Sequence, residues 1–155
     1  MKTVWAALLG GIAAGLIDIV SAFASFAPGG VTPDSILRYV ASGLIGKAAL
    51  EGGWATVILG LFVQVGLTTI MAGGFVLLSR ASRRVLEWPW ISGMAWGTLT
   101  CLAMNYVVVP ISGAPNWHPP SGWGLVSALL AGNFYVGVPI ACIAREFLAK
   151  PASTA

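Results

Sequence analysis

The chain has 155 residues, of which 57% are hydrophobic and only 8% are charged. Because a soluble domain carries about 25% charged residues, this composition excludes a water-facing globular surface. It predicts one all-α integral membrane domain over residues 1–155. The formal net charge of +3 is too small to indicate a nucleic-acid partner. The two cysteines, Cys101 and Cys142, fall in apolar stretches at different depths, which disfavours a disulfide or a shared metal ion.

Residues 4–26 form the first predicted span, since about 20 apolar residues cross a hydrocarbon layer roughly 30 Å thick. Asp18 is the one carboxylate in this run. Facing lipid would cost it about 2.5–3.5 kcal/mol. The residues at helical spacing from it are small or hydroxylated: Gly11, Ala14, Gly15, Ser21, Ala22 and Ser25. We therefore expect Asp18 to face protein. A cleaved signal peptide is the alternative, although the run is longer than a typical signal core.

Residues 34–51 predict an amphipathic helix between the first two spans. Thr32 suits the N-cap position and Pro33 the first helical position. Its four charged residues have i,i+4 spacing and predict two surface ion pairs: Asp34–Arg38 and Lys47–Glu51. We expect this helix to lie along the membrane surface. The alternative is a re-entrant segment, in which Arg38 or Lys47 would pair with Asp18.

Three further apolar stretches predict spans at residues 54–79, 89–111 and 121–144. Small and polar side chains follow a four-residue spacing along the second and third spans: Thr56, Gly60, Gln64, Thr68 and Ala72, then Gly93, Gly97, Cys101 and Asn105. Pro139 predicts a kink in the fourth span. If the N-terminus is cytoplasmic, one side holds six basic residues: Lys2, Arg80, Arg83, Arg84, Arg145 and Lys150. The other side holds Arg38 and Lys47, so the sequence predicts both termini in the cytoplasm.

Four polar side chains within the spans make up a candidate intramembrane site. Gln64 and Asn133 lie near the predicted midplane, whereas Asp18 and Asn105 lie toward the outer face. All four could line one cavity that holds a proton, an ion or a small solute, with Asp18 as the titrating group. The alternative is that the three amides only join helices, which is worth about 0.6 kcal/mol per hydrogen bond.

Two glycine pairs predict close helix packing: Gly11 with Gly15, and Gly93 with Gly97. Each pair could pack within the bundle or form the seam of a homodimer. His118 is the single histidine, so the sequence predicts no metal site and no bound cofactor. Nothing resembles a nucleophile elbow, a phosphate-binding loop or a pair of catalytic carboxylates. An enzyme is therefore only a third alternative.

Several motifs resemble those of a known family. The segment VVVPISGAPNWHPP at Val107–Pro120, followed by Trp123 and Gly132-Asn133, resembles the YagU-like bacterial inner-membrane proteins. The segments AAGLID at 13–18 and LRYVASGLIG at 37–46 are similar to those of small four-span relatives. In that family histidine often stands at the positions of Gln64 and Asn133, so the resemblance implies that this chain lacks two titratable groups on which a metal or proton-relay role would draw. It also implies a bacterial inner membrane and no established activity.

The combined interpretation is a four-span membrane protein with one interfacial helix and the lipid bilayer as its surroundings. The leading functional hypothesis is a non-enzymatic membrane subunit that packs with itself, as a homo-oligomer, or with a larger membrane complex. The alternative is a small-solute or proton carrier or channel, in which Asp18 titrates and the three amides contact the solute.

Overall fold

A computed structural model describes residues 1–149, which form helices and connecting turns without any β-strand. Four of its helices are long and apolar enough to cross a membrane, which confirms the four predicted spans and indicates a multi-pass membrane protein. The first two are α1 (Lys2–Phe26), extended by η1 (Ala27–Gly29), and α3 (Trp54–Ala81). The third consists of α5 (Pro89–Ala103), η3 (Met104–Val108) and α6 (Val109–Ile111), and the fourth of α7 (Trp123–Ala131), η4 (Gly132–Gly137) and α8 (Val138–Leu148).

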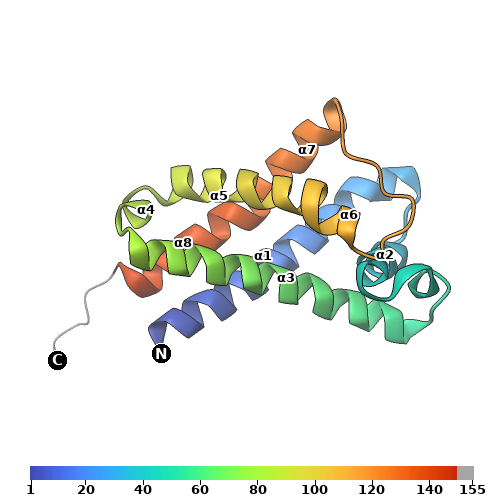
Figure 1. Ribbon diagram of the computed structural model, residues 1–155, viewed down its shortest axis with the longest axis horizontal. Coiled ribbons are helices and arrows are strands. Elements are labelled where there is room, and N and C mark those ends of the chain that lie inside the picture. Colours follow the sequence, from blue (N-terminus) through green and yellow to red (C-terminus); the bar gives the residue numbers. More distant parts are fainter. Residues whose placement is uncertain (150–155) are drawn as a thin grey trace.

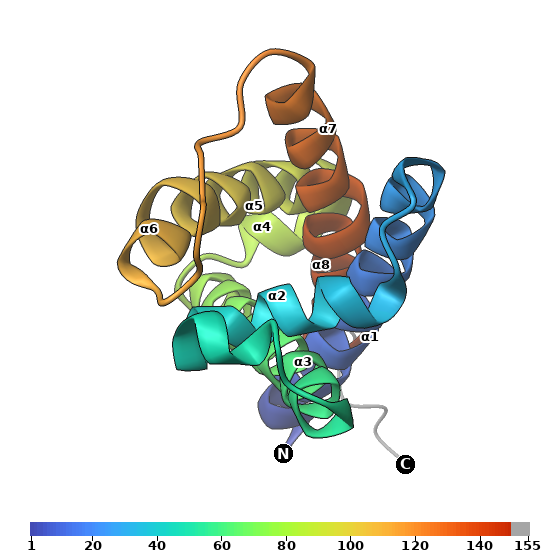
Figure 2. The same ribbon diagram turned by 90° about the vertical axis from the view of Figure 1, so that its right-hand side faces the viewer.

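The four spans run along the long axis of the molecule, with the start of α1 and the end of α8 at the same end (Figure 1). The short helix α4 (Arg84–Glu87) joins α3 to α5 at that end. At the opposite end α2 (Pro33–Ile45) crosses the bundle (Figure 2). α1 packs along α3 and α8, and α5 packs along η4 and α8. As a result, α3 and α5 diverge away from α4 (Figure 1).

The predicted helix at 34–51 is shorter in the structure, because α2 ends at Ile45. Gly46 there adopts φ 70°, a left-handed conformation that glycine tolerates, and the 3-10 turn η2 (Gly46–Ala49) follows. Arg38 and Asp34 form the expected ion pair at 3.1 Å. Within residues 1–149, Lys47 and Glu51 form no ion pair, since no regular helix turn connects them.

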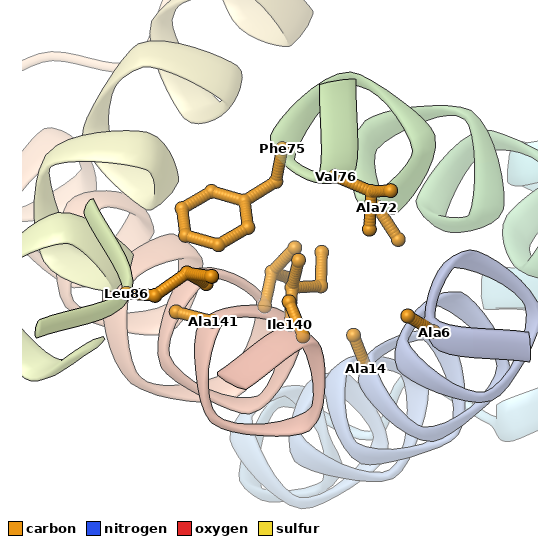
Figure 3. Packing of buried hydrophobic residues seen from close by; sticks show 10 residues of the cluster. Ala6, Ala14, Ala72, Phe75, Val76, Leu86, Ile140 and Ala141 are labelled. Carbon is orange, nitrogen blue, oxygen red and sulfur yellow. The ribbon is translucent and has the colours of Figure 1, made fainter. Parts of the chain in front are cut away.

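The principal core lies between α1, α3, α5 and α8, near the end where α4 joins the spans. Phe75 and Ile140 are its largest fully buried side chains. Around them lie alanines, which let the helix backbones approach closely: Ala6, Ala14, Ala72, Ala141 and Ala144 (Figure 3). Phe75 also stacks edge to face on Trp96, with ring centroids 5.9 Å apart.

A second, smaller cluster fixes α2 to the spans. Leu37 of α2 is buried against Ile19 of α1 and Val57 of α3. The backbone carbonyl of Leu37 also lies directly on Gly60, where a Cβ atom would overlap it. α2 therefore crosses α3 at a point where only glycine leaves enough room.

Both predicted glycine pairs lie at contacts between helices of the same chain. A Cβ on Gly11 or Gly15 would meet Thr69 or Thr68 of α3. On Gly93 or Gly97 it would meet the backbone of Gly137 or Gly132, in η4. These glycine faces are thus occupied within the bundle, which leaves them no room to form a homodimer seam.

Two of the spans contain a π-helical turn just before a proline. The Val109 amide donates to the Met104 carbonyl, and the Val138 amide donates to the Asn133 carbonyl, each five residues back. Pro110 and Pro139 follow and have no amide hydrogen to continue the regular pattern. The structure thus places a wide turn immediately before Pro139, where the sequence predicted a kink.

Candidate intramembrane site

A cavity of about 250 Å³ lies between the four spans. Every span contributes to its wall. Its polar lining consists of Asp18 from α1, Gln64 and Thr68 from α3, Thr100 and Cys101 from α5, and Asn105 from η3. Three of the four sequence-predicted site residues, Asp18, Gln64 and Asn105, therefore share one cavity.

The carboxylate of Asp18 faces this cavity and the neighbouring helix. Gln64 Nε2 donates a hydrogen bond to Asp18 Oδ2 at 2.7 Å. Within the described part of the chain, no other hydrogen bond reaches the carboxylate, and no Lys, Arg or His lines the cavity. The arrangement differs from the re-entrant alternative, since Arg38 pairs with Asp34 instead of Asp18. One carboxylate oxygen thus remains available to a ligand.

Close packing of α1 on α3 positions the Asp18–Gln64 pair. Gly11 and Gly15 bring the two backbones together, two turns and one turn before Asp18 respectively. There the hydroxyl of Thr68, which is buried, donates to the carbonyl oxygen of Gly11 at 2.8 Å. Small residues and one interhelical hydrogen bond therefore hold the carboxylate and the amide within contact distance.

The opposite wall of the cavity carries Asn105 and Cys101. Asn105 Nδ2 donates to the Cys101 carbonyl oxygen at 2.9 Å and lies 3.6 Å from the Cys101 sulfur. The thiol in turn points to the carbonyl oxygen of Ala128 in α7, at 3.4 Å. These contacts use the side-chain amide hydrogens of Asn105 and leave its side-chain oxygen, Oδ1, as an acceptor at the cavity. The titratable groups of the lining are Asp18 and Cys101.

Asn133, the fourth sequence-predicted residue, does not line this cavity. Its Oδ1 accepts a hydrogen bond from the hydroxyl of Thr98 at 3.0 Å, and both side chains are half-buried. Gly132 packs on Gly97, which directs the next residue, Asn133, toward Thr98. Position along a span predicts the depth of a side chain but not its direction, so equal depth did not bring Asn133 and Gln64 together.

Three polar lining residues lie outside the sequence-predicted site: Thr68, Thr100 and Cys101. Thr68 and Cys101 belong to the four-residue stripes of the second and third spans, so a signal for them was present. Thr100 lies outside those stripes, and its hydroxyl bonds to the carbonyl oxygen of Trp96 at 2.9 Å. Such a backbone-satisfied hydroxyl is part of the wall and offers little to a ligand.

A second cavity, also of about 250 Å³, lies between α2, α3 and the third span. Three residues line both cavities: Gln64, Leu67 and Met104. The remaining wall of the second cavity is mainly apolar, with Val40, Val63 and Val108 among its residues. The two spaces are therefore neighbours that share one boundary.

The remaining charged and metal-binding candidates lie outside both cavities. His118 is exposed, with its Nδ1 atom 3.0 Å from the Asn116 carbonyl oxygen. Residues 1–149 contain no group of three His, Cys, Asp or Glu side chains that could hold a metal ion. Four arginines gather near the end where α4 joins the spans: Arg80, Arg83, Arg84 and Arg145. Lys150, which also belongs to the basic residues of the predicted cytoplasmic side, lies outside the described residues.

Within the membrane, this arrangement provides one acidic group, two carboxamides and a thiol around a single space. Such a set suits reversible binding of a cation or a hydrogen-bond donor. No protein-family model, curated protein or solved structure matches the chain. The functional conclusion therefore follows from the geometry of the cavity.

Proposed function

We propose that the protein is a carrier or channel for a proton or a small solute, and that Asp18 is its binding group. The observation that carries this proposal is a carboxylate inside a transmembrane bundle, facing a cavity that contains no compensating cation among the described residues. Ionisable groups within the membrane are costly to retain and commonly mark a path for ions or solutes. Gln64 positions the carboxylate, and Asn105 offers an acceptor on the opposite wall.

In this proposal the protein lies in a bacterial inner membrane with both termini in the cytoplasm, as its basic residues favour. The four arginines near α4 then face the cytoplasm. α2 lies along the outer surface, where the partly exposed Asp34–Arg38 ion pair meets water. Asp18 is in the C-terminal half of α1, so the cavity belongs to the outer half of the bundle.

Proteoliposomes that contain the pH dye pyranine provide the test. Under an imposed pH gradient, the wild-type protein should support proton flux or uptake of radiolabelled methylammonium. Asp18→Asn should abolish this flux, because the amide keeps the shape of the side chain but can neither ionise nor neutralise a cation. The matched control is Asp34→Asn, which removes an exposed carboxylate outside the cavity and should leave the flux unchanged.

Comparable far-UV circular dichroism and elution from gel filtration would show that both variants are folded. If Asp18→Asn retains the wild-type flux, Asp18 is not the transporting group. If the wild-type protein moves neither protons nor methylammonium, the carrier proposal fails altogether.

A second candidate function, a self-associating membrane subunit, is favoured by a different observation. The Thr98–Asn133 pair is only half-buried and lies outside the cavity, on the apolar spans α5 and η4. α7, next to η4, has no buried residue at all. A second copy that covered this region would remove the pair from lipid and could hydrogen-bond to the Asn133 amide. Purification in a mild detergent should then give a discrete oligomer, whereas a lone monomer would contradict this candidate.

A further inference from the structure

The Asp18 cavity borders a second, mainly apolar space, which binding of a proton or a small ion would leave unused. The two cavities share Gln64, Leu67 and Met104 as their common boundary. We infer that together they form one site for a single-chain amphiphile with a protonated amine at its polar end and an alkyl chain at the other. This inference rests on the proposed binding role of Asp18 and names the class of its ligand.

The polar end of the site is complementary to an ammonium group. Asp18 accepts one hydrogen bond from Gln64 and keeps its second oxygen free. The side-chain oxygen of Asn105, Oδ1, is a further acceptor on the opposite wall. No Lys, Arg or His among the described residues lines the cavity, so a cationic ligand would provide the missing positive charge. A primary ammonium offers three donors to these acceptors, as a lysine side chain does.

The apolar end of the site is complementary to a hydrocarbon chain. Val40 of α2, Val63 of α3 and Val108 of η3 face this second cavity. Ser112 is one of its few polar residues, and its hydroxyl already donates to Val109 and accepts from the Ala114 amide, at 2.7 and 3.2 Å. The Ser112 hydroxyl is therefore already satisfied and offers little to a second polar group on the ligand.

The size of the site also favours a chain over an ion. Each cavity holds about 250 Å³, and small-molecule sites generally enclose about 300–1,000 Å³. A single ion or methylammonium would leave the space beyond Leu67 and Met104 empty of ligand. An alkylamine that placed its nitrogen at Asp18 would extend its carbon chain past these two residues toward α2.

The test measures binding of butylamine, octylamine and octanol to the protein in phosphatidylcholine nanodiscs, with empty nanodiscs subtracted. Octylamine should bind up to about 250-fold more tightly than butylamine, because each of its four additional methylenes tightens binding roughly fourfold when it is buried. Octanol should bind more weakly than octylamine, because it lacks the charge. Asp18→Asn should lower the octylamine affinity by roughly 10- to 100-fold, the worth of a hydrogen bond to a charged group, and Asp34→Asn should not.

Two neighbouring valines provide a matched pair for the apolar end. Val108→Trp fills the second cavity and should remove the advantage of octylamine over butylamine. Val107→Trp, at a side chain that is 55% exposed, should leave that advantage unchanged. This pair keeps the inference testable even if Asp18→Asn fails to fold.

The outcomes separate the inference from the proposed function. If butylamine and octylamine bind equally well and both depend on Asp18, the bipartite site is refuted while the binding role of Asp18 stands. The same conclusion follows if Val108→Trp binds octylamine as the wild-type protein does. If no amine binds in an Asp18-dependent way, the inference is refuted, and the proton-flux experiment with Asp18→Asn decides the proposed function independently.

Discussion

Gly11→Ala provides the sharpest test of how the bundle positions its acidic group. The added Cβ atom would overlap the Cα atom of Thr69 and lie 2.5 Å from its Oγ1 and 2.7 Å from its backbone nitrogen. Backbone atoms cannot rotate away, so α1 must move off α3. This movement would strain the Thr68–Gly11 hydrogen bond and the 2.7 Å contact between Asp18 and Gln64.

The expected magnitude follows from three opposing effects. Overpacking costs about 1–3 kcal/mol, and a lost interhelical hydrogen bond costs about 0.6 kcal/mol. Alanine gains about 1 kcal/mol over glycine in helix propensity. Gly11→Ala should therefore lower the free energy of unfolding by about 0.6–2.6 kcal/mol. Unfolding by titration with sodium dodecyl sulfate, followed by circular dichroism, measures this change.

Gly66→Ala is the matched control, since Gly66 lies in α3 with open space around its Cβ position. There only the propensity effect remains, and the variant should be about 0.5–1 kcal/mol more stable than the wild-type protein. If Gly11→Ala is as stable as Gly66→Ala, the contact between α1 and α3 is looser than the structure implies. The account of how Asp18 meets Gln64 would then be wrong.

Three further predictions concern the core, self-association and α2. Phe75→Ala should lower the free energy of unfolding by about 3 kcal/mol. Phe62→Ala, at a side chain that is 72% exposed on the same helix, should change that free energy by less than about 0.5 kcal/mol. Equal losses in denaturant titrations would contradict the core assignment. Asn133→Leu should weaken the association free energy of any oligomer seen by light scattering by about 0.6–1.7 kcal/mol. Asn105→Leu should leave it unchanged. If Asn133→Leu also leaves the oligomer unchanged, Asn133 does not lie in the interface. A hydrogen bond from the Thr32 side chain and the positive charge of Arg38 lower the pKa of Asp34 from its ordinary value. This carboxylate therefore stabilises α2 fully at pH values above its unfolded pKa of about 3.9. The contribution is lost as the pH falls through the lower pKa of the folded state. A carboxyl-carbon NMR titration that gave an unshifted pKa would refute this.

The spans were predictable because hydrophobicity is a property of consecutive residues. Predicted boundaries such as 54–79 lie within a few residues of the observed helix, Trp54–Ala81. The end of α2 was harder to predict, because the helical periodicity of its side chains continues past Ile45. Only the backbone conformation of Gly46, with φ 70°, shows that the helix stops there.

The site was predictable only in part. Asp18 has small neighbours at helical spacing, so its inward direction followed from the sequence, and Gln64 and Thr68 share one stripe on α3. Asn105 and Asn133 looked equivalent, since each is a mid-span asparagine a few residues before a Val-Pro pair. In the structure each lies in a π-helical turn, yet only Asn105 reaches the cavity.

The sequence by itself determined the membrane setting, the number of spans and the inward direction of Asp18, because each depends on local hydrophobicity and helical spacing. The tertiary structure decided which amide meets that acid and which does not. It also decided that the polar cavity borders an apolar one beneath α2. These features depend on the rotation of each helix about its axis, which π-helical turns alter and which close contacts between glycines and neighbouring backbones then fix.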